Sequence, residues 1–248
     1  MTEYLDFYLQ DGQTESNVSL WRKRLREAPS EVLSVCASIE KKDAGEEQRI
    51  CVGCEMLRAV VDRLHEILSG VERLMRQMPR SASFFSSAED RRSAFWRVCH
   101  FLTALEEGAG RLREETGMLT QMWEHANAGL LSLMQNESIL RAILLAAEEE
   151  EHTETASFVR TVLRKNEQIR QHVVRFETIL GDACRMLAQV SEEDVCAFCE
   201  EIAKASDLEH AGQDALPTRV LQILEDYQRV LLRRTEQGRS FLTELEET

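Results

Sequence analysis

From Phe95 to Ala147, apolar residues recur at alternating steps of three and four with almost no interruption. An average step of about 3.5 is typical of a helix that packs along other helices at a shallow angle, and it would not keep one face of a strand buried. Only Thr116 and Glu137 in this series are not apolar. The spacing therefore predicts a long helix within a bundle. The positions are Phe95, Val98, Leu102, Leu105, Ala109, Leu112, Thr116, Leu119, Trp123, Ala126, Leu130, Leu133, Glu137, Leu140, Leu144 and Ala147.

The composition agrees with long helices joined by few turns. The 248 residues include only 3 prolines and 11 glycines, and 43% of them are hydrophobic. Residues of high helix propensity dominate, whereas β-branched residues are sparse. We therefore expect an all-α fold: an elongated antiparallel bundle of three or four long heptad-patterned helices, with shorter helices at the N-terminus.

Capping signals predict where the early helices begin. Asn17 and Ser30 are candidate N-caps for two short helices, one on each side of Pro29. Asp43 and Glu46 have the spacing of a capping box, in which each side chain satisfies a free backbone amide, and this predicts the start of a longer helix.

These signals suggest a domain organisation. Short N-terminal helices over residues 1–42 are expected to pack on a main helical bundle over residues 43–248. The alternative is one continuous domain over residues 1–248.

The helix expected after Asp43 carries a wide apolar stripe from Leu57 to Met78, so it should face more than one neighbour. Pro79 should end this helix, and residues 80–87 should form a linker. A second capping box, from Ser86 to Glu89, should open the helix of the long repeat. Several glycines leave open whether residues 89–148 form one helix or a hairpin. They are Gly108, Gly110, Gly117 and Gly129.

A second clean repeat runs from Val159 to Val190, with Asn166 as its one polar member. A lone Asn at such a seam position costs stability, but it also disfavours every helix register in which it has no partner. The alternative interpretation is that Asn166 lies at a frayed or solvent-facing site. Residues 191–194 should cap a following short helix. Pro217 suits the first turn of the last helix.

The formal net charge is −14, which disfavours a general nucleic-acid role because duplex binding depends on neutralising phosphates. One basic cluster stands beside Trp21. It could contact phosphate or anionic lipid, or it could be the solvated face of a short helix. Its members are Arg22, Lys23, Arg24 and Arg26.

No membrane span is expected, because the longest clean apolar run, Ala142 to Ala147, is far shorter than the roughly 20 residues that a bilayer requires. The first residues also lack the basic region of a secretory signal. Seven cysteines, an odd number, suit reduced thiols better than a disulfide framework. We therefore expect a cytoplasmic protein.

Two CxxC motifs carry the sharpest chemical signal: Cys51 with Cys54, and Cys196 with Cys199. Four thiolates can close a tetrahedral zinc site, and both pairs lie on the flank of a helical apolar stripe. The long separation between the motifs and the absence of glycine-rich knuckles argue against such a site. Thioredoxin-like redox chemistry is disfavoured because no strand precedes either motif.

The histidines offer less. Glu149 and His152 form one Glu-x-x-His, but a ferritin-like di-iron bundle needs two such pairs and two further inward-facing glutamates. Residues 148–151 instead suggest a solvated helix face.

No enzyme class has a physical argument behind it. The expected function is a non-catalytic cytoplasmic adaptor, scaffold or chaperone-like protein that binds another protein, or itself, through helix surfaces. A four-cysteine zinc protein is the alternative, and a di-iron enzyme a weaker one.

Overall fold

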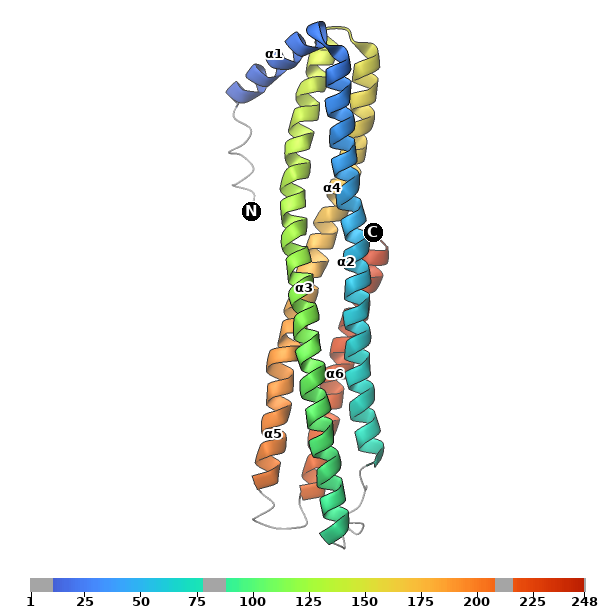
Figure 1. Ribbon diagram of the computed structural model, residues 1–248, viewed down its shortest axis with the longest axis vertical. Coiled ribbons are helices and arrows are strands. Elements are labelled where there is room, and N and C mark those ends of the chain that lie inside the picture. Colours follow the sequence, from blue (N-terminus) through green and yellow to red (C-terminus); the bar gives the residue numbers. More distant parts are fainter. Residues whose placement is uncertain (1–10, 78–87, 208–215, 248) are drawn as a thin grey trace. The chain divides into compact units, whose positions relative to one another are not determined.

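The computed structural model describes residues 11–77, 88–207 and 216–247, and in this part of the chain it contains helices and turns but no strand. The all-α prediction is therefore confirmed. The helices labelled in Figure 1 are α1 (Asp11–Glu27), α2 (Pro29–Gln77), α3 (Ala88–Glu149), α4 (Thr153–Ala188), α5 (Val195–Asp207) and α6 (Leu216–Glu246). The π-helix η3 (Gln189–Asp194) lies between α4 and α5 in the chain.

The long repeat forms a single helix. α3 contains 62 residues without a break, so residues 89–148 are one helix and not a hairpin. The described seam side chains Leu112, Leu119, Leu133 and Leu140 are fully buried. Thr116 is also buried, and its hydroxyl donates a hydrogen bond of 2.7 Å to the carbonyl oxygen of Leu112, which satisfies this polar group within its own helix.

The expected helix start at Asp43 is wrong. α2 runs for 49 residues from Pro29 to Gln77, and Asp43 lies in its interior with only 2% of the residue exposed. Asn17 likewise lies inside α1, and Ser30 follows Pro29, the first residue of α2. A capping box satisfies free amides at a helix end, and Asp43 has no such amides to satisfy because the helix continues on both sides.

The expected cap at residues 191–194 is also wrong. The chain stays helical there and widens into the π-helix η3, where the hydroxyl of Ser191 donates to the carbonyl oxygen of Ala188 at 3.3 Å. Asp194 instead accepts a hydrogen bond of 3.0 Å from Arg234 on α6. The carboxylate therefore joins two helices instead of ending one.

Some predictions concern residues outside the described part of the chain. The linker over residues 80–87 and the Ser86 end of the second capping box belong here, as does most of the loop expected between α5 and α6. Pro217 is the second residue of α6, so its expected place in the first turn is confirmed.

The helices form two compact units. Unit 1 comprises Met1–Val52 and Glu124–Glu177, and unit 2 comprises Gly53–Trp123 and Thr178–Thr248. The helices α2, α3 and α4 each contribute one part to unit 1 and the other part to unit 2. This division does not coincide with the expected one at residues 42 and 43, through which α2 passes unbroken.

In unit 1, α3 and α4 run antiparallel. Glu148 pairs with Arg160 at 2.6 Å, and further along the same helices Glu137 lies 3.5 Å from Arg170. α1 packs on this pair through Val18, Trp21 and Leu25, which join one apolar cluster. The other buried members of that cluster are Val32, Cys36, Ile39, Leu140, Ala142, Ile143, Ala146, Ala147, Ala156, Val159 and Val162.

A tight turn connects α3 to α4 in unit 1. Glu151 adopts a left-handed backbone with a φ of 59°, and the amide of His152 donates to the carbonyl oxygen of Ala147 at 2.9 Å. This six-to-one bond is typical of the Schellman motif, in which glycine is the preferred residue at the left-handed position. Residues 148–151 therefore end a helix, and of these glutamates only Glu150 is half-buried while the other three are exposed.

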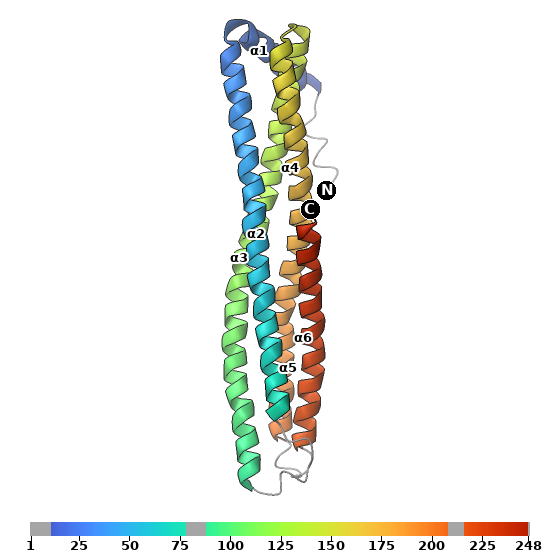
Figure 2. The ribbon, with the colours of Figure 1, turned by 90° about the vertical axis from the view of Figure 1, so that its right-hand side faces the viewer.

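Unit 2 contains parts of α2, α3 and α4 together with η3, α5 and α6, and Figure 2 shows α6 beside α5. The wide stripe of α2 is buried here against more than one neighbour: Val61 faces Gly238 of α6, and Ile67 faces Gly108 of α3. Eight of the described stripe residues are at most 9% exposed and Met75 is half-buried, so this stripe leaves little apolar surface for a partner. The eight are Leu57, Val60, Val61, Leu64, Ile67, Leu68, Val71 and Leu74.

Among the described residues, one stretch is long and apolar enough to cross a membrane by length and composition alone. It is Trp96–Glu149, with a mean hydropathy of 1.2 in its most apolar window. A buried core helix of a water-soluble protein passes the same test.

Candidate functional site

The four cysteines of the two CxxC motifs all lie in helices. Cys51 and Cys196 are exposed, while Cys54 and Cys199 are half-buried. Burial, with Glu106 and Cys196 nearby, raises the pKa of the Cys199 thiol, which opposes the thiolate form that a zinc ligand requires. Within the described residues, no three His, Cys, Asp or Glu side chains are placed to hold a metal ion. The four-cysteine zinc site is thus not assembled among the described residues, and it stays an untested prediction.

The Glu-x-x-His pair lies at the turn between α3 and α4. Glu149 is half-exposed and forms an ion pair with Arg22 of α1, and His152 belongs to neither helix. Neither group is placed as an inward-facing ligand, so the described part of the chain offers the di-iron alternative no support.

The basic cluster of α1 is engaged within unit 1. Arg26 donates two hydrogen bonds to Glu150 at 2.6 and 2.5 Å, and the guanidinium of Arg24 lies 5.0 Å from the ring centroid of Trp21. Arg22 pairs with Glu149, and Lys23 lies 3.9 Å from Glu27. The pairs of Arg22 and Arg26 hold α1 against the C-terminal end of α3 and the turn after it, and all four contacts support the interpretation as a helix face.

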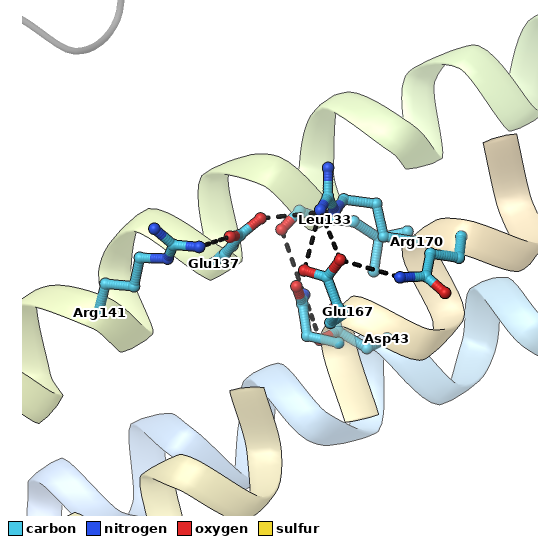
Figure 3. A network of polar contacts seen from close by, with 8 residues as sticks. Asp43, Leu133, Glu137, Arg141, Glu167 and Arg170 are labelled. Atoms are coloured by element: carbon cyan, nitrogen blue, oxygen red, sulfur yellow. Dashed lines mark hydrogen bonds and ion pairs between the residues drawn. The ribbon is translucent and has the colours of Figure 1, made fainter. Parts of the chain in front are cut away.

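A buried polar cluster joins three helices of unit 1, and Figure 3 shows part of it at close range, with Asp43 and Leu133 labelled. Asp43 of α2 accepts one hydrogen bond from Asn136 of α3 and one from Asn166 of α4, each at 2.8 Å. The Asn166 amide also donates to the carbonyl oxygen of Leu133 at 3.2 Å. Asn166 therefore has the specific partners that its seam position requires, and it is neither frayed nor solvent-facing.

The electrostatics of this cluster are unbalanced. Both donors to the Asp43 carboxylate are neutral amides, so its desolvation raises its pKa although the two hydrogen bonds oppose the change. Asn166 is fully buried, and its own Oδ1 has no hydrogen-bond partner among the described residues. The cluster thus holds the helices in register at a cost in stability.

Glu137, the other polar member of the long repeat, lies beside this cluster (Figure 3). Its side chain is 16% exposed and pairs with Arg141 at 2.5 Å and with Arg170 at 3.5 Å. Arg170 also donates to both carboxylate oxygens of Glu167 at 2.9 Å. Glu137 therefore tolerates its position in the apolar seam because two arginines neutralise its carboxylate.

A separate surface feature lies between α2 and α3 in unit 2. It is a groove of about 410 Å³, which we call the arginine groove because four arginines line it. Two glutamates also line it, so its charged residues carry a net +2, whereas the whole chain carries −14. The charged lining residues are Arg63, Arg73, Arg97, Arg111, Glu66 and Glu107.

The four arginines differ in their partners. Arg63 donates hydrogen bonds of 2.9 Å to Glu66 and to Glu115, and Arg97 donates at 2.8 Å to the carbonyl oxygen of Gln77, the last residue of α2. Arg73 and Arg111 are exposed, and neither has an ion pair or hydrogen bond to any described residue. Two guanidinium groups are therefore available to carboxylates from outside.

The floor of the groove is apolar and narrow. It includes Ile67, Leu74, Phe101 and Leu105, and all except the half-buried Phe101 are buried. A Cβ atom on Gly70 would lie 3.4 Å from Phe101, so the two helices approach closely across this floor.

An aromatic stack supports the floor from behind. The ring of Phe101 meets Phe198 of α5 edge-on, with centroids 6.2 Å apart, and Phe198 stacks on Tyr227 of α6 at 4.3 Å. The Tyr227 hydroxyl is buried without a hydrogen-bond partner among the described residues, and burial raises its pKa. The floor is thus held by three helices and is expected to be rigid.

Sequence reasoning missed the arginine groove because its residues come from two helices and match no motif. The available signal was the small residue on each facing helix: Gly70 on α2 and Gly108 on α3. Gly108 was expected only as a possible helix break, but its actual neighbour is the side chain of Ile67, 3.5 Å from where a Cβ would lie.

Comparisons with known proteins found no match to any family model, curated protein or solved structure. The class of the molecule is thus defined by its all-α fold and its surface features alone.

Proposed function

We propose that this chain is a non-catalytic cytoplasmic adaptor that acts through protein–protein contacts, and that the arginine groove binds an acidic helical segment of a partner protein. One observation carries the proposal: Arg73 and Arg111 have no partner among the described residues, although the chain is rich in carboxylates. Exposed arginines beside an apolar floor suit a ligand that offers both carboxylates and apolar side chains.

Binding suits this groove better than catalysis. Arginine stays protonated at all ordinary pH values, so it cannot act as a general acid or base in a reaction. Glu66, one of the two acidic lining residues, is already paired with Arg63, and the exposed Glu107 is the other. The two unpartnered arginines outnumber Glu107, so the charged groups of the groove favour recognition of an anion.

The charge of the chain favours a protein over a nucleic acid. A net charge of −14 repels a long phosphate backbone, while a local +2 can still attract a short acidic segment. The cytoplasmic part of the proposal is supported by the seven cysteines, none of which forms a disulfide.

Fluorescence anisotropy with a labelled peptide tests the proposal. The peptide has about 18 residues, enough to form a helix, with glutamates and small apolar residues on one face. We expect binding that weakens about tenfold in an Arg73→Gln/Arg111→Gln variant and weakens as salt is added. A peptide in which lysine replaces each glutamate should not bind.

A second double variant controls for overall charge. Arg185→Gln/Arg229→Gln also removes two positive charges, but from arginines that form exposed ion pairs with Asp182 and Asp226. It should bind the peptide as the wild type does. No binding by the wild type, equal losses in both variants, or tighter binding of single-stranded RNA or phosphatidylserine vesicles would refute the proposal. So would self-association that depends on Arg73 and Arg111, measured by light scattering.

A further inference from the structure

We infer that the groove selects a helix whose two key carboxylates lie seven residues apart, two turns along one face, with small apolar residues between them. This inference rests on the proposed function and names the pattern that a partner must carry.

The contacts between α2 and α3 give the register of the groove. Arg63 is bonded to Glu115, Ile67 lies against Gly108, and Gly70 lies against Phe101, so residue numbers rise on α2 as they fall on α3. The two helices therefore run antiparallel across the groove, and positions on α3 can be assigned to levels along α2.

This register places the two unpartnered arginines at different levels. Arg111 lies between Gly108 and Glu115, so it is level with the stretch of α2 between Arg63 and Ile67. Arg73 lies about eight residues further along α2. At about 1.5 Å per residue the two guanidinium groups stem from points about 12 Å apart along the groove.

In a partner helix that lies along the groove, residues i and i+7 are separated by about the same distance as the two arginines. Seven residues rise about 10.5 Å and turn through nearly two full turns, so the two side chains share one face. The reach of each arginine covers the small remainder. Residues i and i+5 lie on nearly opposite faces and cannot both reach the arginines.

The floor between these two levels determines the residues between the carboxylates. Gly70 and Gly108 add no side chain there, and Ala104 adds only a methyl group. A neighbouring helix can approach closely at such a surface when its own facing residues are small. Alanine or serine at i+3 and i+4 of the partner therefore suits the floor, whereas tryptophan there would hold the helix away.

Two peptides of identical composition test the spacing. Both carry two glutamates on an alanine-rich helix, at i and i+7 in one and at i and i+5 in the other, and anisotropy measures their binding to the full chain. We expect the i, i+7 peptide to bind at least tenfold more tightly. Circular dichroism of each peptide and each protein variant confirms equal helix content.

A charge reversal identifies the contacts. Arg73→Glu should weaken the i, i+7 peptide, and replacing one of its two glutamates by lysine should restore binding while replacing the other should not. Equal affinity for both spacings, lost in Arg73→Gln/Arg111→Gln, would refute the spacing and leave the adaptor proposal standing. No binding of either peptide would refute both. Charge reversal rescued by neither lysine would also refute the inferred geometry.

Discussion

The side-chain amide of Asn166 on α4 donates a hydrogen bond of 2.8 Å to Oδ2 of Asp43 on α2, and both residues are buried. This contact joins positions 123 residues apart in the chain. Asn166 is costly in an apolar seam, but its hydrogen bond forms in only one register of α4 against α2. Any slip of α4 would leave both groups without partners.

Replacing Asn166 by Leu is expected to destabilise the protein by about 2–3 kcal/mol, because the buried Asp43 carboxylate loses one of its two donors. Urea unfolding followed by circular dichroism measures this. The triple variant Asp43→Leu/Asn136→Leu/Asn166→Leu should recover the loss or exceed wild-type stability. A triple variant less stable than the single one would show that the cluster itself is stabilising.

Stability should depend on pH through Asp43. Its pKa is raised in the folded state, so the folded protein holds this proton more tightly than the unfolded chain does. The stability that Asp43 contributes is therefore fully present below the unfolded pKa of about 3.9, and it is lost as the pH rises through the folded-state pKa.

Asp43→Asn should remove this component of the pH dependence. Unfolding free energies of the wild type and Asp43→Asn, compared from acid to neutral pH, isolate the contribution of Asp43. Glu40→Gln, which breaks a half-exposed pair with Lys165, is the matched control and should keep the wild-type dependence. Parallel pH curves for the wild type and Asp43→Asn would contradict the raised pKa.

Two glycine substitutions should have opposite effects. A Cβ on Gly238 would lie 2.9 Å from Val61, a short and stiff side chain, whereas a Cβ on Gly117 would meet nothing within 4 Å. Gly238→Ala is expected to lower stability by about 1 kcal/mol or more, and Gly117→Ala to raise it by about 0.5–1 kcal/mol through helix propensity. Thermal melts of both variants check the pair, and a stabilising Gly238→Ala would contradict the close packing of α2 on α6.

Burial should hold α1 more strongly than its ion pairs do. Leu25 is fully buried, so Leu25→Ala should cost about 2–4 kcal/mol, while Arg26→Ala should cost far less because its side chain is largely exposed and solvent screens its ion pair. Unfolding free energies and proteolysis at α1 measure the difference. Equal losses of stability in the two variants would mean that the exposed ion pair of Arg26 with Glu150 stabilises α1 as much as the burial of Leu25 does.

The cysteines should react in an order set by exposure. Maleimide should label Cys51 and Cys196 first and Cys36 last, because Cys36 is buried and its pKa is raised to about 11. Added zinc should not slow this labelling, and a chelator should leave the melting temperature unchanged. Bound zinc in purified protein, with protection of both CxxC pairs, would instead establish the four-cysteine site.

The sequence by itself determined the helices and their buried faces. The described seam residues of α3 and α4 lie inward because only inward positions at that spacing can hide apolar side chains along a helix. Helix boundaries were harder to predict, since the capping signal at Asp43 depends on short-range chemistry that a tertiary contact can override.

Only the tertiary structure decided which distant groups meet. Asp43 of α2 faces Asn136 of α3 and Asn166 of α4 because these three helices pack in one register. Arg73 and Arg111 share one groove because α2 and α3 pack side by side in another part of the fold. Periodicity determines which face of a helix is buried. It does not determine the helix that covers that face or the register between the two, because those depend on how side chains far apart in the chain pack together.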